Sequence, residues 1–167
     1  MLDFTTRPSG HIAAIPTRTG RLTPTGSVGV AFNLWLPSGR SPDGGWPVAI
    51  CGHGRDVAKN FCVSIAAMLA SPGLAVISAN AMGHGAGSRT TMTVTRTDGT
   101  EATFSAPGLG SDQNGDGMIA TWEPSWAERP FGIYGESGPI LQSAAHILQL
   151  VRAIQKGVDG DGDGGRI

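Results

Sequence analysis

Charged and aromatic residues are scarce in this chain, and long apolar runs are absent. Of the 167 residues, 15% are charged and 6% aromatic, and 12 basic against 13 acidic side chains give a formal net charge of −1. Because no basic cluster is present, we expect no binding to nucleic acid or to an anionic membrane surface. No run approaches the length of a transmembrane helix, and the first residues lack the basic and apolar regions of a signal peptide. The chain is therefore either cytoplasmic or part of a longer exported parent.

Cysteine is also scarce, since only Cys51 and Cys62 occur. The first follows a predicted strand and the second lies on the following helix, so a bridge that closes a short loop is compatible with their positions. Buried thiols are the more frequent arrangement, and we therefore expect two free cysteines. Glycine is abundant by contrast: 26 Gly and 11 Pro indicate many turns and long loops and argue against a helical bundle.

The apolar residues predict a strand–helix–strand unit. Residues 47–51 and 74–78 are short continuous apolar runs, typical of strands covered on both faces. Residues 56–70 between them have a helical pattern, with Asp56 as the expected cap. The expected buried face of this helix comprises Val57, Phe61, Ile65 and Met68. Because such a unit places its strands parallel, we expect an α/β fold, a three-layer α/β/α sandwich with a mixed, mostly parallel sheet.

The remaining segments complete one domain over residues 1–167, because the length suffices for one core and is too short for two ordinary domains. Residues 28–36 alternate between apolar and polar side chains and predict an antiparallel strand. Residues 86–136 form a long loop excursion with a hairpin around Asp98 and Gly99. A helix is expected at about 139–155, and its apolar stripe should pack on the sheet. The stripe comprises Ile140, Ala144, Ile147, Leu148, Val151 and Ile154.

A Gly52-His53-Gly54-Arg55 turn follows the first of the two apolar runs, and Gly83-His84-Gly85 follows the second. Glycine lets a ligand approach a sharply turned backbone, and acyl transfer needs backbone N–H donors aimed at the developing oxyanion. In such a site the Arg55 N–H would donate, Gly54 would allow the turn and His53 would shape it. The simpler alternative is a tight turn without catalysis, and the repetition of the motif favours the functional interpretation.

Segments Trp46–Gly54 and Ala75–Gly85 resemble the third and fourth strands of the α/β-hydrolase superfamily, each with its His-Gly turn. The tail from Leu148 to Gly164 is similar to the corresponding part of large secreted bacterial lipase- and esterase-like hydrolases. The resemblance spans about residues 28–167 and implies ester hydrolysis through an acyl-serine intermediate. It also implies that the serine-bearing strand opens at Gly165-Arg166-Ile167 and that the rest of the domain, with the catalytic serine, belongs to a longer parent. The chain would then be inactive alone, and its substrate, a small or lipid ester, would bind only in the parent.

Ser137 offers an alternative nucleophile, since Gly135-Glu136-Ser137-Gly138 precedes a predicted helix. Pro139 replaces the second glycine of a nucleophile elbow, and the downstream His146 is expected on the polar side of its helix. A helix cap is therefore the favoured role of Ser137. A small complete hydrolase that uses Ser137 remains one alternative function, and a calcium-binding, non-catalytic secreted module remains another.

A second motif points to calcium. Residues 112–123 match the calcium-loop template D-x-[DN]-x-[DN]-G-x5-E at every position. The expected ligands are the side chains of Asp112, Asn114, Asp116 and Glu123 and the backbone carbonyl of Met118. The flanking helices of an EF-hand are missing, because Gly108-Leu109-Gly110 precedes the loop and Pro124 follows it. We therefore expect a structural Ca²⁺ site; a solvated Asp/Asn/Gly turn is the alternative.

Asp159, Asp161 and Asp163 repeat the first half of the same template. They form either an incomplete Ca²⁺ site or a flexible acidic linker, because the ligand at position 12 would fall beyond Ile167. Calcium loops of weak to moderate affinity function where calcium is plentiful. The sequence thus favours an extracellular or cell-surface location for the parent protein.

Overall fold

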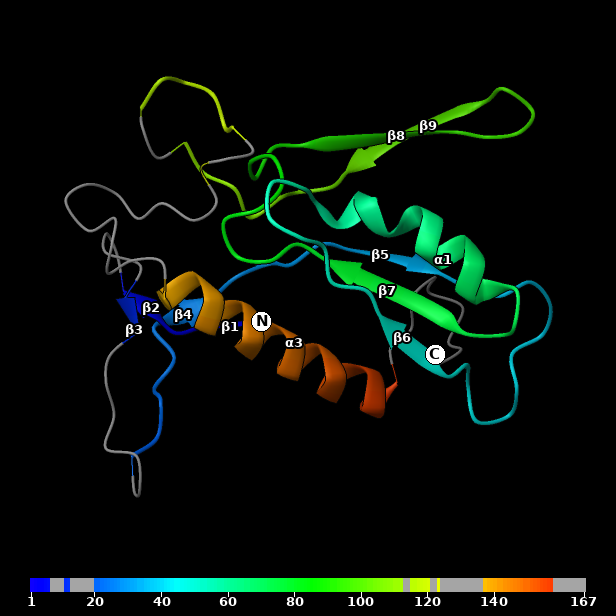
Figure 1. The fold of residues 1–167 in the computed structure, drawn as a ribbon, viewed down its shortest axis with the longest axis horizontal. Helices are drawn as coiled ribbons and strands as arrows, with labels where there is room; N and C mark the ends of the chain where they lie inside the picture. The colour runs from blue at the N-terminus through cyan, green and yellow to red at the C-terminus, as the bar shows by residue number, and fades with distance from the viewer. Residues whose placement is uncertain (7–10, 13–19, 113–114, 121–122, 124–136, 158–167) are drawn as a thin grey trace.

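The computed structural model describes residues 1–6, 11–12, 20–112, 115–120, 123 and 137–157 (Figure 1). The strands of this part of the chain are β1 (Leu2–Asp3), β2 (Thr5–Thr6), β3 (His11–Ile12), β4 (Gly26–Ser27), β5 (Phe32–Trp35), β6 (Val48–Ile50), β7 (Ala75–Ala79), β8 (Thr91–Thr95) and β9 (Glu101–Ser105). Its helices are the 3₁₀ turn η1 (Lys59–Cys62), α1 (Val63–Ala70) and α3 (Ser137–Lys156).

The described strands form four small sheets rather than one large sheet. Three of the sheets are antiparallel pairs, β1 with β4, β2 with β3 and β8 with β9. The fourth has the order β5-β7-β6, in which β5 is antiparallel and β6 parallel to β7. The prediction of a three-layer α/β/α sandwich with a mostly parallel sheet is therefore wrong, and the fold is a small mixed α/β domain. Parallel pairing needs a crossover connection, and among the described strands only β6 and β7 are paired in this way.

Strand β7 is the centre of the core. Ala75, Val76, Ile77 and Ser78 are each 0% exposed, so the prediction of a strand covered on both faces is confirmed for this run. The same prediction is wrong for β6. That strand pairs with β7 along one edge, and its last residue, Ile50, is 36% exposed.

Helix α1 packs against β7 and β5 through small side chains (Figure 1). Cys62 and Ala66 are fully buried, whereas Phe61, Ile65 and Met68 are exposed. The predicted apolar face was therefore wrong, because the small residues, four positions apart, allow the helix to approach the sheet closely. Asp56 does not cap this helix either, since η1 begins after Ala58 without a side-chain cap.

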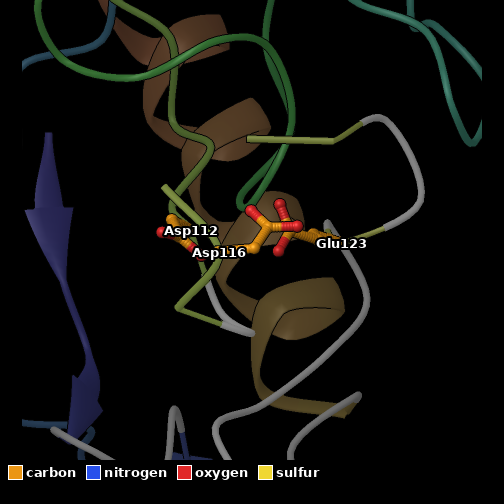
Figure 2. A group of neighbouring side chains, drawn as sticks. All are labelled: Asp112, Asp116 and Glu123. Carbon is orange, nitrogen blue, oxygen red and sulfur yellow. The ribbon is translucent and has the colours of Figure 1, made fainter. Parts of the chain in front are cut away.

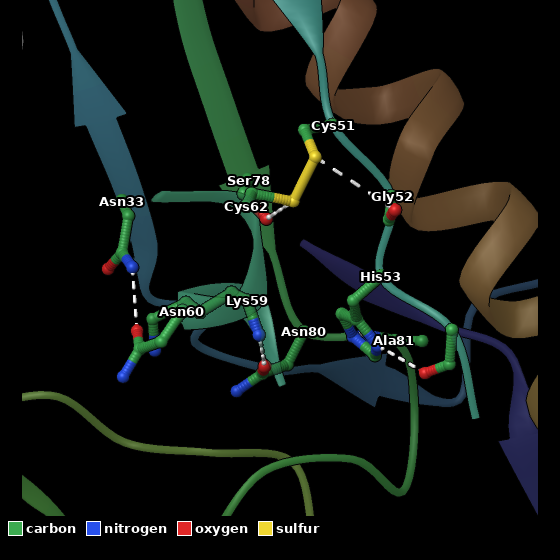
Figure 3. Close-up of a disulfide and its surroundings, with 11 residues drawn as sticks. Asn33, Cys51, Gly52, His53, Lys59, Asn60, Cys62, Ser78, Asn80 and Ala81 are labelled. Atoms are coloured by element: carbon green, nitrogen blue, oxygen red, sulfur yellow. Dashed lines mark hydrogen bonds between the residues drawn. A yellow bond between two sulfur atoms is a disulfide. The ribbon is translucent and has the colours of Figure 1, made fainter. Parts of the chain in front are cut away.

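A disulfide joins Cys51, directly after β6, to Cys62 at the start of α1 (Figure 3). The expectation of free cysteines was therefore wrong. The two Cα atoms lie 6.1 Å apart, within the usual range for a bridge, and the hydroxyl of Ser78 on β7 donates to the Cys62 sulfur at 3.3 Å. The bridge ties the carboxyl end of β6 to the helix that follows it.

Helix α3 confirms the predicted element but buries a different face. Its buried side chains include Gln142, His146 and Leu150, which lie four residues apart. Of the predicted apolar stripe, Ile140, Ile147 and Leu148 are exposed, so the expected packing on the sheet is wrong. Instead α3 packs against β2 and β3.

Gln142 explains this orientation of α3. Its Oε1 accepts from the Phe4 N–H at 2.8 Å, and its Nε2 donates to the Leu2 carbonyl at 2.9 Å. The same Nε2 lies 2.7 Å from Nε2 of His146. The polar side of the helix thus supplies hydrogen-bond partners to part-buried backbone groups of the N-terminal segment.

The hairpin expected around Asp98 and Gly99 is confirmed as β8 and β9. Thr91 to Thr95 pair with Ser105 to Glu101 in antiparallel register. Gly99 has φ of 81° in the turn, and Asp98 accepts from both the N–H and the hydroxyl of Thr100. Residues 86–112 of the predicted excursion therefore contain regular structure, and the excursion returns to the body of the domain beside the turn after β7.

Candidate functional site

Three carboxylates of the predicted calcium loop converge. One oxygen each from Asp112, Asp116 and Glu123 lies within 4.8 Å of the others, and this group can hold a metal ion (Figure 2). Asp112 and Asp116 are exposed, whereas Glu123 is 1% exposed. The sequence spacing of positions 1, 5 and 12 in the template therefore corresponds to a real spatial cluster.

The backbone of the loop is folded around Asp112. Its Oδ1 accepts from the Gly115 N–H at 2.7 Å and its Oδ2 from the Gly117 N–H at 2.7 Å. Both glycines have positive φ, 79° and 85°, a conformation that side chains rarely adopt. Asp116 accepts in turn from the Met118 N–H at 2.8 Å. These bonds turn the chain so that Asp112 and Asp116 face the same point.

Glu123 approaches from the far end of the loop. Its Oε2 accepts from the Ala120 N–H at 2.6 Å, which closes a short turn before the carboxylate. A carboxylate is costly to bury without compensating charge or hydrogen bonds. A cation held jointly with Asp112 and Asp116 would supply such a charge.

The other five predicted ligands are Met118, Asn114 and the three aspartates of the second half-template. Met118 is described, and its side chain is 69% exposed, consistent with a residue expected to contribute only its backbone carbonyl. Asn114 lies outside the described residues, as do Asp159, Asp161 and Asp163.

The second predicted site is the Gly52–Arg55 turn after β6, where His53 holds the backbone. Its Nε2 accepts from the Ala81 N–H at 2.9 Å, and its Nδ1 lies 2.8 Å from the Gly54 carbonyl (Figure 3). Because a carbonyl only accepts and a backbone N–H only donates, this geometry assigns the donor role to Nδ1 and the acceptor role to Nε2. His53 thus joins the turn after β6 to the turn after β7, which agrees with the expected role of shaping the turn.

His84, from the second His-Gly turn, lies against His53. The two ring centroids are 4.9 Å apart, and Nδ1 of His84 is 3.1 Å from the Met82 carbonyl. Burial lowers the pKa of His84, and His53 and Arg55 add to the lowering. The hydrogen bond to the Met82 carbonyl and the nearby Asp56 oppose it. The imidazole is therefore neutral at pH 7, with Nδ1 protonated and Nε2 available as an acceptor. The repeated motif was the only sequence signal for this pairing.

Gly54 and Arg55 stand at the carboxyl end of the parallel strand β6. Within the described part of the chain, their backbone N–H groups donate to no acceptor. Both residues are exposed. The turn therefore offers two backbone donors to an incoming group.

Ser137 is the first residue of α3. Residues 131–136, which precede it in the alternative nucleophile elbow, lie outside the described residues, and so does the Ser137 side chain. The structure brings the His53 turn, His84 and Asp56 together. The cluster of Asp112, Asp116 and Glu123 lies apart from them in sequence, in the 86–136 excursion.

Comparison with protein-family models, with curated proteins and with solved structures found no match to this chain. Within the described residues, none of the helices combines the length and apolar character that a membrane span needs.

Proposed function

We propose that residues 112–123 bind one Ca²⁺ ion and that the ion stabilises the excursion in which they lie. The observation that carries this proposal is the convergence of Asp112, Asp116 and Glu123 within 4.8 Å. All three ligands offer oxygen, the donor that Ca²⁺ prefers, and no sulfur or imidazole belongs to the cluster. The sequence template adds Asn114 and the Met118 carbonyl as further oxygen ligands.

The role of the ion is structural. A calcium sensor opens a pair of helices that flank its loop, but Gly108 and Gly110, which precede this one, lie outside any helix. We also propose an extracellular location for the protein. Calcium loops of moderate affinity fill where calcium is plentiful, and the Cys51–Cys62 disulfide persists in oxidising compartments.

Titration calorimetry with Ca²⁺ tests this function. We expect one ion per chain for the wild type and at least about a tenfold weaker affinity for Glu123→Gln, which removes a charged ligand from the cluster. Glu101→Gln is the matched control, since Glu101 is an exposed carboxylate on β9 outside the cluster, and it should bind like the wild type. Absence of heat from the wild type, or equal affinity for both variants, would refute the proposal.

A second proposal concerns the turn after β6, which we infer to be half of an oxyanion-binding site of a serine ester hydrolase. The available N–H groups of Gly54 and Arg55 at the end of a parallel strand favour it, because backbone donors stabilise the oxyanion of acyl transfer. The substrate would be a small or lipid ester. His53 would act by holding the turn, because both of its ring nitrogens are engaged with backbone groups.

A serine-directed fluorophosphonate separates the alternatives for this second proposal. If Ser137 is a nucleophile, the wild-type chain is labelled and Ser137→Ala is not. A non-catalytic calcium-binding module is not labelled in either form, even with its calcium site filled. Labelling that persists in Ser137→Ala would exclude the Ser137 mechanism.

A further inference from the structure

A cavity lies between the turn after β6 and the metal loop. Its volume is about 420 Å³, within the range of small-molecule sites. Asp56, Phe61, Ile119 and Ala120 are among its lining residues, together with Gly85 and Ala86 from the turn after β7. The cavity therefore joins three segments that are far apart in the sequence, and two of them belong to the candidate sites described above.

The backbone at the edge of this cavity is held in an unusual conformation. Asp56 has φ of 64°, and it is the only non-glycine residue with positive φ in the described part of the chain. Such residues persist only where the surrounding structure imposes them, and they are frequent at ligand sites. Asp56 is exposed and directly follows the donors of Gly54 and Arg55. The edge of the cavity thus continues into the turn that we propose to bind an oxyanion.

The opposite wall is attached to the metal cluster. Ala120 donates its N–H to Glu123, and the neighbouring Ile119 packs on glycine backbone. A Cβ at Gly87 would lie 2.6 Å from Cδ1 of Ile119, and one at Gly110 would lie 2.9 Å from its Cγ2. Ile119 is therefore seated against two segments whose glycines leave room for it.

Those two segments are themselves joined by backbone hydrogen bonds. Gly108 donates to the Gly87 carbonyl at 3.2 Å, and Leu109 donates to the His84 carbonyl at 2.9 Å. A continuous set of contacts thus runs from Glu123 through Ala120 and Ile119 to the turn after β7. A change at the metal cluster can reach the cavity wall along these contacts.

Binding of the ion changes the energy of this arrangement. Without a cation, the three carboxylates, whose oxygens lie within 4.8 Å of one another, repel and favour conformations in which they are farther apart. With Ca²⁺ the same carboxylates are drawn together, so Glu123 and the wall formed by Ile119 and Ala120 stay in place. A ligand that contacts this wall therefore has more affinity for the calcium-bound form.

We propose that this cavity binds the apolar part of a neutral carboxylic ester and that Ca²⁺ at residues 112–123 tightens the binding. The inference rests on both proposed functions and adds the regulation of one site by the other. Val57, Phe61 and Ile119 provide apolar walls, whereas the Asp56 carboxylate stands at the edge. An anionic ligand would meet a like charge there, so the cavity should select an ester over the free carboxylate that its hydrolysis releases.

The test uses ethyl propyl ketone, which has the shape of methyl butyrate and cannot be hydrolysed. The full chain, labelled with ¹³C at isoleucine methyl groups, is titrated in calcium-saturated and in calcium-free buffer, and the shift of the Ile119 methyl signals gives the affinity. We expect at least about fivefold tighter binding with calcium, the lower end of usual coupling between sites. Butyrate should bind more weakly than the ketone in both buffers.

Two tryptophan variants locate the ligand. Ala86 is an exposed residue of the cavity lining, so Ala86→Trp should obstruct the cavity and abolish the ketone-induced shifts. Ala144→Trp is the control, because Ala144 is also exposed but lies on α3, outside the lining, and should leave the shifts unchanged. Far-ultraviolet circular dichroism of both variants verifies that they fold.

The possible failures are distinguishable. If calorimetry shows no calcium binding, the proposed metal function fails and the coupling fails with it. If calcium binds but the ketone affinity is the same in both buffers, the coupling is wrong and the calcium site stands. If the ketone produces no shifts in either buffer, or binds equally to Ala86→Trp, the cavity is not the ligand site.

Discussion

Calcium should stabilise the wild-type chain, whereas Glu123→Gln should match or exceed the stability of the wild type only in calcium-free buffer. In the wild type, Ca²⁺ should raise the melting temperature, because the ion binds the folded loop and not the unfolded chain. In calcium-free buffer, Glu123→Gln should melt at the same temperature as the wild type or higher. The substitution removes two of the three carboxylate pairs within 4.8 Å, and the glutamine carbonyl can still accept from Ala120.

The size of both effects follows from the cluster. Two carboxylates 4.8 Å apart repel by about 1 kcal/mol at the dielectric constant of water. Calcium loops of extracellular modules have dissociation constants of about 10⁻⁴ to 10⁻³ M, so about 10 mM Ca²⁺ adds about 1.4 to 2.7 kcal/mol of stability. For a chain of 167 residues this corresponds to a rise of about 3 to 11 °C.

Differential scanning fluorimetry of both proteins, with calcium, with magnesium and with a chelator, measures these effects. Magnesium should give the smaller rise, since it demands a tighter octahedral ligand set. Glu101→Gln serves as control and should follow the wild type in every buffer. The reasoning is refuted if calcium leaves the wild type unchanged, or if it raises the melting temperature of Glu123→Gln by the same amount.

Three further predictions concern the rest of the domain. Replacing Cys51 and Cys62 by serine should lower the free energy of unfolding by about 3 kcal/mol in urea titrations, because the unfolded chain regains the entropy that closing a short loop removes. An unchanged urea midpoint would contradict the bridge. Burial lowers the pKa of His146 from its usual 6.5; the terminal ammonium adds to the lowering and Asp3 opposes it. The contribution of this histidine to stability is therefore complete above pH 6.5 and is lost as the pH falls through the lower folded-state pKa. The urea midpoint of the wild type should fall on acidification, and that of His146→Gln should fall less. Gln142→Leu should cost about 1–3 kcal/mol because it removes the partner of the part-buried Phe4 N–H and one partner of the Leu2 carbonyl, whereas the exposed Gln155→Leu should change stability by less than about 0.5 kcal/mol.

Patterns contained within a short segment were predictable. The hairpin at Asp98 and Gly99 was identified from turn residues between alternating strands, and the buried strand β7 from its continuous apolar run. Residues 112–123 were predicted to be a metal-binding loop, and three of the predicted carboxylates converge because the glycines turn the backbone as the template requires. In each case the residues that determine the structure are neighbours in sequence.

Predictions of which surface a helix buries were less successful. The apolar stripe of α3 is largely exposed. Gln142 and His146 are buried instead, because the Leu2 carbonyl and the Phe4 N–H need hydrogen-bond partners from this side of the helix. On α1, two small side chains are buried in place of larger apolar ones, because close approach to β7 and β5 decides the contact. Periodicity identifies the faces of a helix, but the partner surface decides between them.

The sequence by itself determined the parallel pair β6 and β7, the turns that follow them and the order of ligands in the metal loop. Each of these depends on local backbone preferences and on residue spacing. Only the tertiary structure decided the division into four small sheets, the Cys51–Cys62 bridge and the contact of His53 with His84. It also decided that Ile119 of the metal loop forms a wall of the cavity beside Asp56. These arrangements join residues distant in sequence, and their geometry depends on how the elements pack.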